Sequence, residues 1–335
     1  MSTAYFDAAR GLAGELAVEL AGDVARAEAV LNSSLESDVE RVSTIGKHVS
    51  EAGGKRLRPL FVALAARSTL REYDPARVAS LGACMEMIHM ATLIHDDVVD
   101  NAETRRGRPT ACSLYGNTAG ILCGDVLLAR AMELLAIDGD LEIIRMVSKA
   151  VVEMAGGEVM EVDTRGVYDL DEARHFEILR RKTATFIAAC CRSGAMAAGA
   201  TDAQVDSFGV YGEAVGMGFQ IADDLLDFRS EASVSGKPRA IDFREGCATL
   251  PLILVRPRLS ADEDDYVRSK FGNGVVDSDL ERISAWMSER GAYEAAQSQA
   301  REYADRAKEA LAGIPESPSA DLLAGLADLL ILRDA

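Results

Sequence analysis

The sequence is poor in basic residues and in paired cysteines, and each shortage argues against a class of protein. Its 335 residues include 36 Lys and Arg against 54 Asp and Glu, which gives a formal net charge of −18. This balance argues against a nucleic-acid partner, because phosphate backbones are bound by surfaces rich in positive charge. The six cysteines form no CxxC pair, so neither a zinc site nor a disulfide framework is indicated. Reduced thiols fit a cytoplasmic protein, and we expect that location.

Long apolar runs are also missing. The longest stretch without Asp, Glu, Lys or Arg covers residues 109–124 and contains a proline and three glycines, whereas a membrane-spanning helix needs about 20 apolar residues. Acidic residues at Asp7, Glu15 and Glu19 occupy the region where a signal peptide would need a basic end and an apolar run. Hydrophobic residues still make up 48% of the chain, which is enough for a large core. We therefore expect a globular protein without a membrane segment.

Proline is scarce in a way that predicts the fold. Only eight prolines occur, none falls between Pro109 and Pro238, and the residues between them are mostly good helix formers. Apolar residues just before this gap recur three or four positions apart, as in Val78, Leu81 and Met85, which is the spacing of a buried helix face. No fixed-period repeat or interdomain linker is evident. The sequence predicts an all-α protein with one large domain over residues 1–335.

Two acidic motifs of the form DDxxD dominate the rest of the sequence. Each follows nine residues without Asp, Glu, Lys or Arg, and residues i and i+4 of a helix face the same side. Carboxylates this close repel one another unless a cation lies between them, and Mg²⁺ binds through a few carboxylates together with substrate phosphates. A solvated helix face would explain one such motif, but two copies with identical spacing favour a metal site. The motif residues are Asp96, Asp97, Asp100, Asp223, Asp224 and Asp227.

Two basic clusters accompany the acidic motifs. In the segment GGKRLRP (residues 53–59), Lys55 and Arg58 lie three positions apart, which we expect to place them on one face at a helix start. The segment TRRGRPT (residues 104–110) places Arg105 and Arg106 just after the first acidic motif. Arginine pairs in loops are often merely exposed to solvent. In a chain this acidic, however, basic clusters beside metal-binding motifs indicate a site for diphosphate.

Over roughly residues 46–254, the order of the motifs resembles the trans-isoprenyl diphosphate synthases, or polyprenyl synthetases. The resemblance rests on GGKRLRP, EMIHMATLIHDDVVDNAETRRGRPT, GDVLLARAMELL, RRKTATFIAACC, GFQIADDLLDF and GKPRAIDFREGCATLPLIL. It implies a bundle of antiparallel helices around a central cavity, usually as a homodimer. It also implies a prenyltransferase of isoprenoid biosynthesis, which condenses isopentenyl diphosphate head-to-tail with dimethylallyl, geranyl or farnesyl diphosphate. The product would be an all-trans polyprenyl diphosphate, and the cofactor would be Mg²⁺, with three ions when substrate is bound.

The same resemblance implies a role for each matching residue. Asp96, Asp100 and Asp223 match the principal magnesium ligands, and Asp97, Asp224 and Asp227 match direct or water-mediated partners. The diphosphate of isopentenyl diphosphate would be held by Lys55, Arg58, His89 and Arg106. The allylic diphosphate would be held by Arg105, Lys182, Thr183, Gln220 and Lys237. Lys182, Arg105, Asp96 and Asp223 would carry the catalytic step by stabilising the charge on the leaving diphosphate.

Two positions depart from the family pattern. Ala240 stands where the family has a glycine, and Cys247 stands where it has a lysine that holds the allylic diphosphate. We therefore expect weaker binding of the allylic substrate, because a charged hydrogen bond contributes about 1.5–3 kcal/mol. Product length in this family depends on how deep the cavity runs below the first acidic motif. The small side chains of Ala91 and Thr92, with Met87 and Ile88 one turn earlier, leave it open and predict a product of twenty carbons or more.

Three other functions are possible. A non-catalytic partner subunit of a heteromeric synthase would explain Cys247, but such a subunit would be expected to lose an acidic motif. A terpene cyclase or a head-to-head condensing enzyme on a related helical fold is disfavoured by the two basic clusters, because a cyclase has no second diphosphate to hold. A purely structural helical bundle would leave both acidic motifs unexplained.

Overall fold

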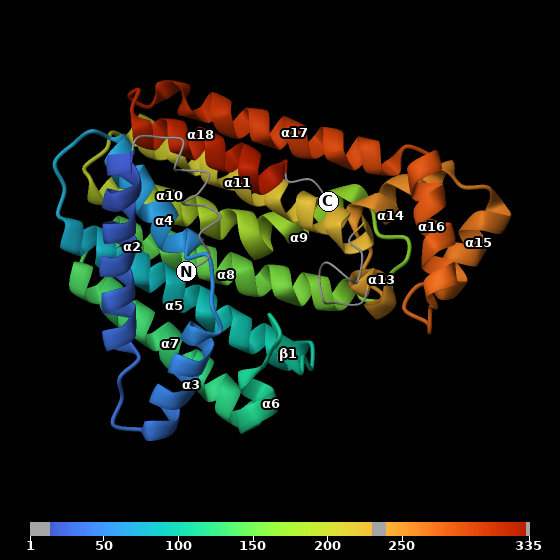
Figure 1. Cartoon of the computed structure of the whole chain (residues 1–335), viewed down its shortest axis with the longest axis horizontal. Coiled ribbons are helices and arrows are strands. Elements are labelled where there is room, and N and C mark those ends of the chain that lie inside the picture. The colour runs from blue at the N-terminus through green and yellow to red at the C-terminus, as the bar shows by residue number, and fades with distance from the viewer. Residues whose placement is uncertain (1–13, 230–238, 333–335) are drawn as a thin grey trace. The chain divides into compact units, whose positions relative to one another are not determined.

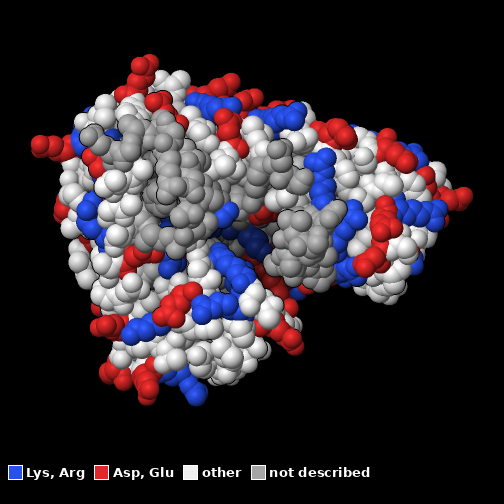
Figure 2. All heavy atoms as spheres, in the orientation of Figure 1, with Lys and Arg blue, Asp and Glu red and all other residues white. Residues whose placement is uncertain are grey.

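The computed structural model describes residues 14–229 and 239–332, and this part of the chain is almost entirely helical (Figure 1). Within these residues the strands are β1 (Thr104–Arg105) and β2 (Arg108–Pro109), which form a small antiparallel hairpin. The all-α class predicted from the scarcity of proline is confirmed. Acidic and basic side chains are interspersed on the face that Figure 2 shows.

The chain divides into two compact units. The first covers residues 1–148, 189–209 and 313–323, and the second covers 149–188, 210–312 and 324–335. The single domain over residues 1–335 therefore stays a prediction. Helices with residues in both units are α8 (Leu141–Thr164), α10 (Thr185–Ala197), α11 (Asp202–Arg229) and α18 (Pro318–Ile331).

The first unit is built around α5 (Pro75–Val99), which packs against α2, α4 and α7 (Figure 1). This helix begins where the sequence signals a start, because the Asp74 side chain accepts a hydrogen bond from the Ala76 N–H and Pro75 occupies the first turn. Its apolar residues are buried along most of its length. The unit also contains α2 (Gly14–Ser34), α3 (Glu40–Glu51), α4 (Leu57–Ser68), α6 (Ala111–Tyr115) and α7 (Asn117–Asp138).

The second unit has its own apolar core, which includes Phe228, Phe243 and Phe271 in edge-to-face contact. Helix α14 (Leu250–Val255) packs against α9, α16 and α17. The other elements are α9 (Glu172–Leu179), the π-helical turn η1 (Arg180–Ala184), α13 (Ile241–Glu245), η2 (Arg256–Arg258), α15 (Ala261–Lys270), α16 (Asp277–Glu289) and α17 (Ala292–Ala310), followed by η3 (Leu311–Gly313) at the unit boundary.

Candidate active site

The first acidic motif lies at the carboxyl-terminal end of α5. Asp96 and Asp97 occupy its last turn, and Asp100 is the residue that caps it. The carboxyl end of a helix carries a partial negative charge, so three carboxylates there are unfavourable unless a cation compensates them. Asp96 is partly exposed and Asp100 is exposed, whereas Asp97 is buried. The position of the motif in the fold therefore favours cation binding independently of its sequence.

Asp97 is held within the first unit by Arg105 of β1. The Arg105 Nε donates to Asp97 Oδ1 over 2.7 Å. Burial raises the pKa of the Asp97 carboxyl, and the charge of Arg105 opposes that rise. Arg105, one of the two hairpin arginines predicted to bind a diphosphate, therefore forms an ion pair with the acidic motif itself.

The β1–β2 hairpin holds the arginine pair in a fixed conformation. Arg105 and Arg108 are paired across it, which leaves Arg106 and Gly107 as a two-residue turn, and both turn residues have positive φ (53° and 74°). This conformation is typical of type I′ turns and is unfavourable for a side chain such as that of Arg106. The hairpin is anchored to α3, because His48 Nε2 donates to the Pro109 carbonyl (2.9 Å) and Arg108 Nη1 donates to the Glu51 carbonyl (2.6 Å).

The basic cluster at residues 55–58 differs from the prediction in one respect. Helix α4 begins at Leu57, and Arg56 precedes it in the left-handed conformation with φ 48°. Lys55 therefore lies before the helix rather than on one helical face with Arg58, and the expectation of a shared face is wrong. A tertiary contact explains the difference, because Arg56 Nη1 donates to the buried carboxylate of Glu86 on α5 (3.0 Å).

In the first unit, the charge of Arg58 acts on His89. Burial, reinforced by the guanidinium groups of Arg58 and Arg106, lowers the pKa of His89 well below its usual value, so the imidazole is neutral. Burial also lowers the pKa of Arg58, and Glu86 opposes that change. The four residues predicted to hold isopentenyl diphosphate all lie in the first unit, and the charges of Arg58 and Arg106 act on His89.

The second acidic motif lies in the last two turns of α11, again at the carboxyl end of a long helix. Asp224 is buried, and its Oδ2 accepts hydrogen bonds from His175 Nε2 (2.8 Å) and from the Leu250 N–H (3.0 Å). Asp227 Oδ1 accepts from the Ile241 N–H (2.9 Å). Burial raises the pKa of Asp227 to about 6, although this hydrogen bond opposes the rise. Asp223 is partly exposed.

Lys182 lies in the π-helical turn η1, which the sequence did not predict. Its ammonium group forms ion pairs with Glu158 (2.9 Å) and Glu161 of α8. Burial by itself would lower the pKa of Lys182, but Glu161 and Glu158 outweigh it and raise that pKa. The close approach of α8 needs Gly157, because a Cβ there would lie 2.7 Å from the Lys182 backbone nitrogen.

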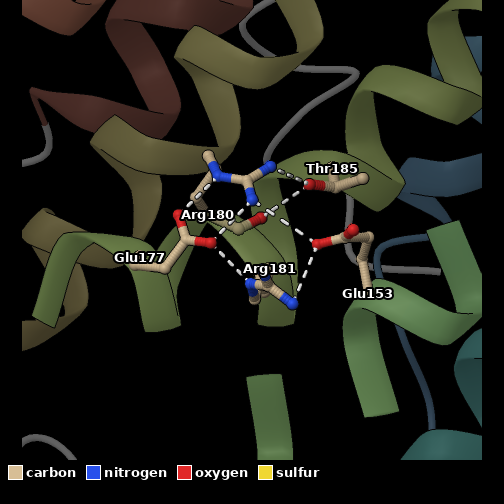
Figure 3. A network of polar contacts seen from close by, with 5 residues as sticks. All are labelled: Glu153, Glu177, Arg180, Arg181 and Thr185. Atoms are coloured by element: carbon tan, nitrogen blue, oxygen red, sulfur yellow. Dashed lines mark hydrogen bonds and ion pairs between the residues drawn. The ribbon is translucent and has the colours of Figure 1, made fainter. Parts of the chain in front are cut away.

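A polar network surrounds the π-helical turn (Figure 3). Glu177 accepts from Arg180 (2.8 and 2.9 Å) and from Arg181 (2.5 Å), and Glu153 lies 3.4 Å from both arginines. The Thr185 hydroxyl donates to the Arg180 carbonyl (3.0 Å). These contacts fix the turn that carries Lys182, and π-helical turns occur frequently at functional sites.

The remaining predicted residues have less distinctive surroundings. Thr183 and Gln220 are partly buried in the second unit. Met87, Ile88 and Ala91 are buried in α5, whereas Thr92 is partly buried and its hydroxyl donates to the His89 carbonyl (2.8 Å). Lys237 lies outside the described residues.

The two departures from the family pattern have structural consequences. Ala240 is buried with φ 53°, a conformation that glycine adopts without strain, and its N–H donates to the Asp227 carbonyl (2.8 Å). Burial, together with Asp242 and Glu161, raises the pKa of Cys247 to about 12, so its thiol is neutral. A neutral group therefore occupies the position of the family lysine.

Sequence reasoning missed several charged side chains. Glu158, Glu161 and His175 are far in sequence from the groups that they contact, and no motif marked them. Glu86 had a signal: between Arg77 and Asp96 it is the only Asp, Glu, Lys or Arg, and it lies three residues before His89. A lone carboxylate on an apolar helix face requires a buried partner, and Arg56 supplies it.

A helical fold with two aspartate motifs and two sets of cationic residues defines a trans-prenyl diphosphate synthase. The polyprenyl synthetase family model matches residues 39–285. The heptaprenyl diphosphate synthase component 2 of Geobacillus stearothermophilus is 36% identical over 318 residues, which cover 94% of this chain and 97% of that protein. The nonaprenyl diphosphate synthase of Mycobacterium tuberculosis is 38% identical over 314 residues, which cover 92% of each chain.

Solved structures agree. The decaprenyl diphosphate synthase of Rhodobacter capsulatus superposes with a TM-score of 0.90 at 36% identity, covering 95% of this chain and 98% of that one. A polyprenyl synthase of Caulobacter crescentus, solved with calcium and isoprenyl diphosphate, gives a TM-score of 0.88 at 36% identity, covering 94% and 95%. The chain belongs to the polyprenyl synthetase family and is a prenyltransferase. The family and the enzyme class predicted from the motifs are confirmed.

Proposed function

We propose that this chain lengthens a short allylic diphosphate with isopentenyl diphosphate units and releases a product in the hepta- to decaprenyl range. The observation that carries the proposal is the placement of both DDxxD motifs at the carboxyl ends of long helices, where carboxylates need cations. The relatives that are 33–38% identical and whose names give a chain length are heptaprenyl to decaprenyl synthases, whereas those named geranylgeranyl or short-chain synthases are 26–32% identical. The more similar relatives therefore support this range over a twenty-carbon product.

Magnesium fits the donor set. All six motif side chains offer hard carboxylate oxygens, and Asp227 Oδ2 is buried without a hydrogen-bond partner among residues 14–229 and 239–332. Within these same residues, no three acidic, His or Cys side chains already converge around an ion position. Mg²⁺ is usually bound through one or two carboxylates, together with waters and substrate phosphates that supply its other ligands. Bound magnesium supplies stabilisation of the negative charge on the departing diphosphate.

The aspartates divide into two groups by their surroundings. We assign Asp96, Asp100 and Asp223, which are exposed or partly exposed, as the principal ligands of three ions. Asp97 and Asp224 already accept hydrogen bonds from the fold, so they act through water or orient the helix end. Asp227 has one carboxylate oxygen left for direct or water-mediated binding.

Cationic groups hold the two substrates. Isopentenyl diphosphate is bound by Lys55, Arg58 and Arg106, with neutral His89 as a hydrogen-bonding partner. Lys182 binds the allylic diphosphate by exchanging Glu158 and Glu161 for phosphate oxygens, since these carboxylates hold it in the absence of substrate. The other allylic contacts are Arg105, Thr183, Gln220 and Lys237.

The reaction follows from this charge arrangement. Lys182 and Arg105 stabilise the leaving diphosphate as the allylic carbon–oxygen bond breaks. The double bond of isopentenyl diphosphate then attacks the allylic cation, and a proton passes to the released diphosphate. Apolar side chains of the site exclude water, which would otherwise trap the cation as an alcohol.

Product length gives a direct test of the wall residues on α5. Ala91 is small and Thr92 is bonded to the preceding turn, so we propose that the prenyl chain grows past them toward Met87 and Ile88. Ala91→Phe should shorten the main product. An unchanged product distribution would contradict the assignment of this wall.

We also propose a cytoplasmic homodimer. Among the described helices, α5 alone is long and apolar enough to cross a membrane, and 72% of its most apolar window is buried. Apolar side chains at least half exposed occur on α6, α7 and the start of α8, and we assign them to the dimer interface. They are Leu114, Leu122, Ile137 and Leu141.

A heteromeric synthase is the second candidate. It is favoured by the relative named component 2 and by Cys247, which removes a cation from the allylic site. The mass of the purified chain in solution, measured with its activity, separates the two: an active dimer supports the first, and an inactive chain supports the second.

The function is tested by incubating the full-length protein with Mg²⁺, labelled isopentenyl diphosphate and dimethylallyl, geranyl or farnesyl diphosphate in turn. We expect products longer than twenty carbons that vanish when a chelator is added. Products of twenty carbons or fewer would contradict the proposed length, and cyclic products would contradict the reaction.

A further inference from the structure

Glu86 is a buried carboxylate that none of the proposed roles uses. Glu86 lies on the apolar helix α5 and is only 4% exposed. One oxygen, Oε1, accepts a hydrogen bond from Arg56 Nη1 over 3.0 Å. The other, Oε2, is buried and has no hydrogen-bond partner within residues 14–229 and 239–332. A half-satisfied buried carboxylate is costly, so its presence requires an explanation.

Arg56, the partner of Glu86, is fully engaged by the protein. Its Nε donates to Glu28 (3.1 Å), and its Nη2 donates to the Ser50 carbonyl and hydroxyl (3.0 and 3.1 Å). With Nη1 on Glu86, every nitrogen of the guanidinium group is used. Arg56 is therefore a structural residue, although it lies between two residues proposed to bind a diphosphate.

The backbone of Arg56 links these contacts to the diphosphate site. It has φ 48° and immediately precedes α4, so its conformation sets the direction in which the chain passes from Lys55 to Arg58. This left-handed conformation is unfavourable for a side chain and persists only where surrounding contacts hold it. The ion pairs with Glu86 and Glu28 are such contacts.

Other basic groups of the first unit lie near Glu86. A Cβ added at Gly54 would lie 3.2 Å from Arg106 Nη1, 3.7 Å from Arg56 Nη1 and 4.0 Å from Glu86 Oε1, which places three of these groups around one point. Arg58 Nε is buried without a hydrogen-bond partner in the described part of the chain, and the charge of Glu86 acts on it. Glu86 is thus the buried counter-charge within a group of guanidiniums.

We infer that Glu86 is a positioning residue for isopentenyl diphosphate: it holds Arg56, and through it fixes Lys55 and Arg58 for the incoming diphosphate. This inference rests on the proposed function of the basic cluster. The opposite effect, in which Glu86 weakens the binding of isopentenyl diphosphate, is also physically reasonable, because a carboxylate repels a nearby anionic ligand. If repulsion dominated, removing the charge would tighten binding, so the sign of the effect decides between the two.

The test measures binding of isopentenyl diphosphate to the full-length protein by titration calorimetry, together with the KM of each substrate. Glu86→Gln should raise the Kd and KM for isopentenyl diphosphate about tenfold, and leave the KM for the allylic substrate unchanged. Glu86→Asp keeps the charge but withdraws it from Arg56, so it should weaken binding as well. The matched control, Glu28→Gln, removes the more exposed partner of Arg56 and should have a smaller effect.

A double-mutant cycle shows whether Glu86 acts through Arg56. Arg56→Gln with Glu86→Gln should bind no more weakly than Arg56→Gln alone. Unchanged or tighter binding in Glu86→Gln, or wild-type affinity in Glu86→Asp, would overturn the inference. A wild type that binds isopentenyl diphosphate but forms no product would contradict the proposed function alone, and the loss of binding in Glu86→Gln would still support the positioning role. A wild type that does not bind it would overturn both.

Discussion

The two aspartate motifs have the same sequence pattern but different partners. In each motif the second aspartate, Asp97 or Asp224, is buried and engaged by the fold, whereas the first remains partly exposed. Asp97 is bonded to a cation, Arg105, whereas Asp224 is bonded to an imidazole and a backbone N–H. Asp227 likewise depends on a backbone N–H.

This difference shows that the same metal-binding pattern can be supported by different hydrogen-bond partners. The first motif has part of its negative charge balanced by the protein. In the second motif, Asp224 and Asp227 each accept a hydrogen bond from a backbone N–H, and the other partner of Asp224 is the His175 imidazole. The identical DDxxD spacing therefore does not imply identical electrostatics, and five substitutions test this difference.

The largest effect is expected when a principal ligand is neutralised in either motif. Asp96→Asn and Asp223→Asn should each lower the condensation rate about 100- to 1,000-fold, because each removes stabilisation of the leaving diphosphate. Initial rates at saturating Mg²⁺ measure the effect, and unfolding midpoints near that of wild type exclude misfolding. A variant that retains more than about a tenth of the activity would show that its motif is dispensable.

A pH series separates the charge balance of the two motifs. Burial raises the pKa of Asp227 from 3.8 to about 6, so this carboxyl stabilises the fold when protonated. Its contribution is complete below pH 3.8 and is lost as the pH rises through 6, and the neighbouring Asp242, whose pKa burial and Asp227 raise, adds to the same trend.

The measurement compares the free energy of unfolding of wild type and Asp227→Asn in chelator. The wild type should lose stability relative to the variant between pH 4 and pH 7. The same comparison with Asp97→Asn should change less, because Arg105 opposes the raised pKa of Asp97. Equal changes would remove the distinction between the motifs.

The buried second aspartates should differ in their contribution to stability. Asp224→Asn leaves His175 or the Leu250 N–H without an acceptor and should cost about 2 kcal/mol, since the side chains of Asp224 and His175 are only 9% and 7% exposed. Asp97→Asn should cost about 1 kcal/mol, because Arg105 is 35% exposed and can turn to water. Chemical denaturation measures both, and the reverse order would contradict the assigned environments.

Cys247 provides a test of charge added to the second unit. Cys247→Lys restores the family cation and should lower the KM for the allylic substrate about tenfold, which corresponds to about 1.4 kcal/mol. Cys247→Met is the uncharged control and should not lower it. An unchanged KM in the lysine variant would show that this position does not weaken allylic binding.

The smallest effect is expected at Ala240. Ala240→Gly should stabilise the protein by up to about 1 kcal/mol, because glycine adopts φ 53° without strain. Ala129→Gly, at an exposed position in the interior of α7, is the control and should destabilise by about 1 kcal/mol. Loss of stability in Ala240→Gly would mean that packing of the methyl group outweighs the backbone strain.

Local signals in the sequence predicted the helices and the motifs. Scarce proline and helical periodicity identified α5, and Asp74 with Pro75 marks its start. The two basic clusters are visible in the sequence itself, and the resemblance added Lys182 and Lys237. Lys182 lies in η1, and Lys237 lies outside the described residues.

The remaining features depend on contacts between distant residues. Nothing near Arg56 in the sequence indicates a left-handed residue, because Glu86, thirty positions away, stabilises it. The π-helical turn at Lys182 depends on carboxylates from α8 and α9. The burial of Asp224 depends on His175, 49 positions earlier. Such pairings arise only when the helices pack.

The central claim is that both acidic motifs bind the allylic diphosphate through Mg²⁺. Thermal unfolding tests this claim most directly. The unfolding midpoint of the full-length protein would be measured with Mg²⁺ and a non-hydrolysable thio analogue of farnesyl diphosphate, each alone and together. We predict a large rise in wild type only when both are present, and its loss in Asp96→Asn and in Asp223→Asn. A wild-type rise that persists undiminished in either variant would contradict the claim.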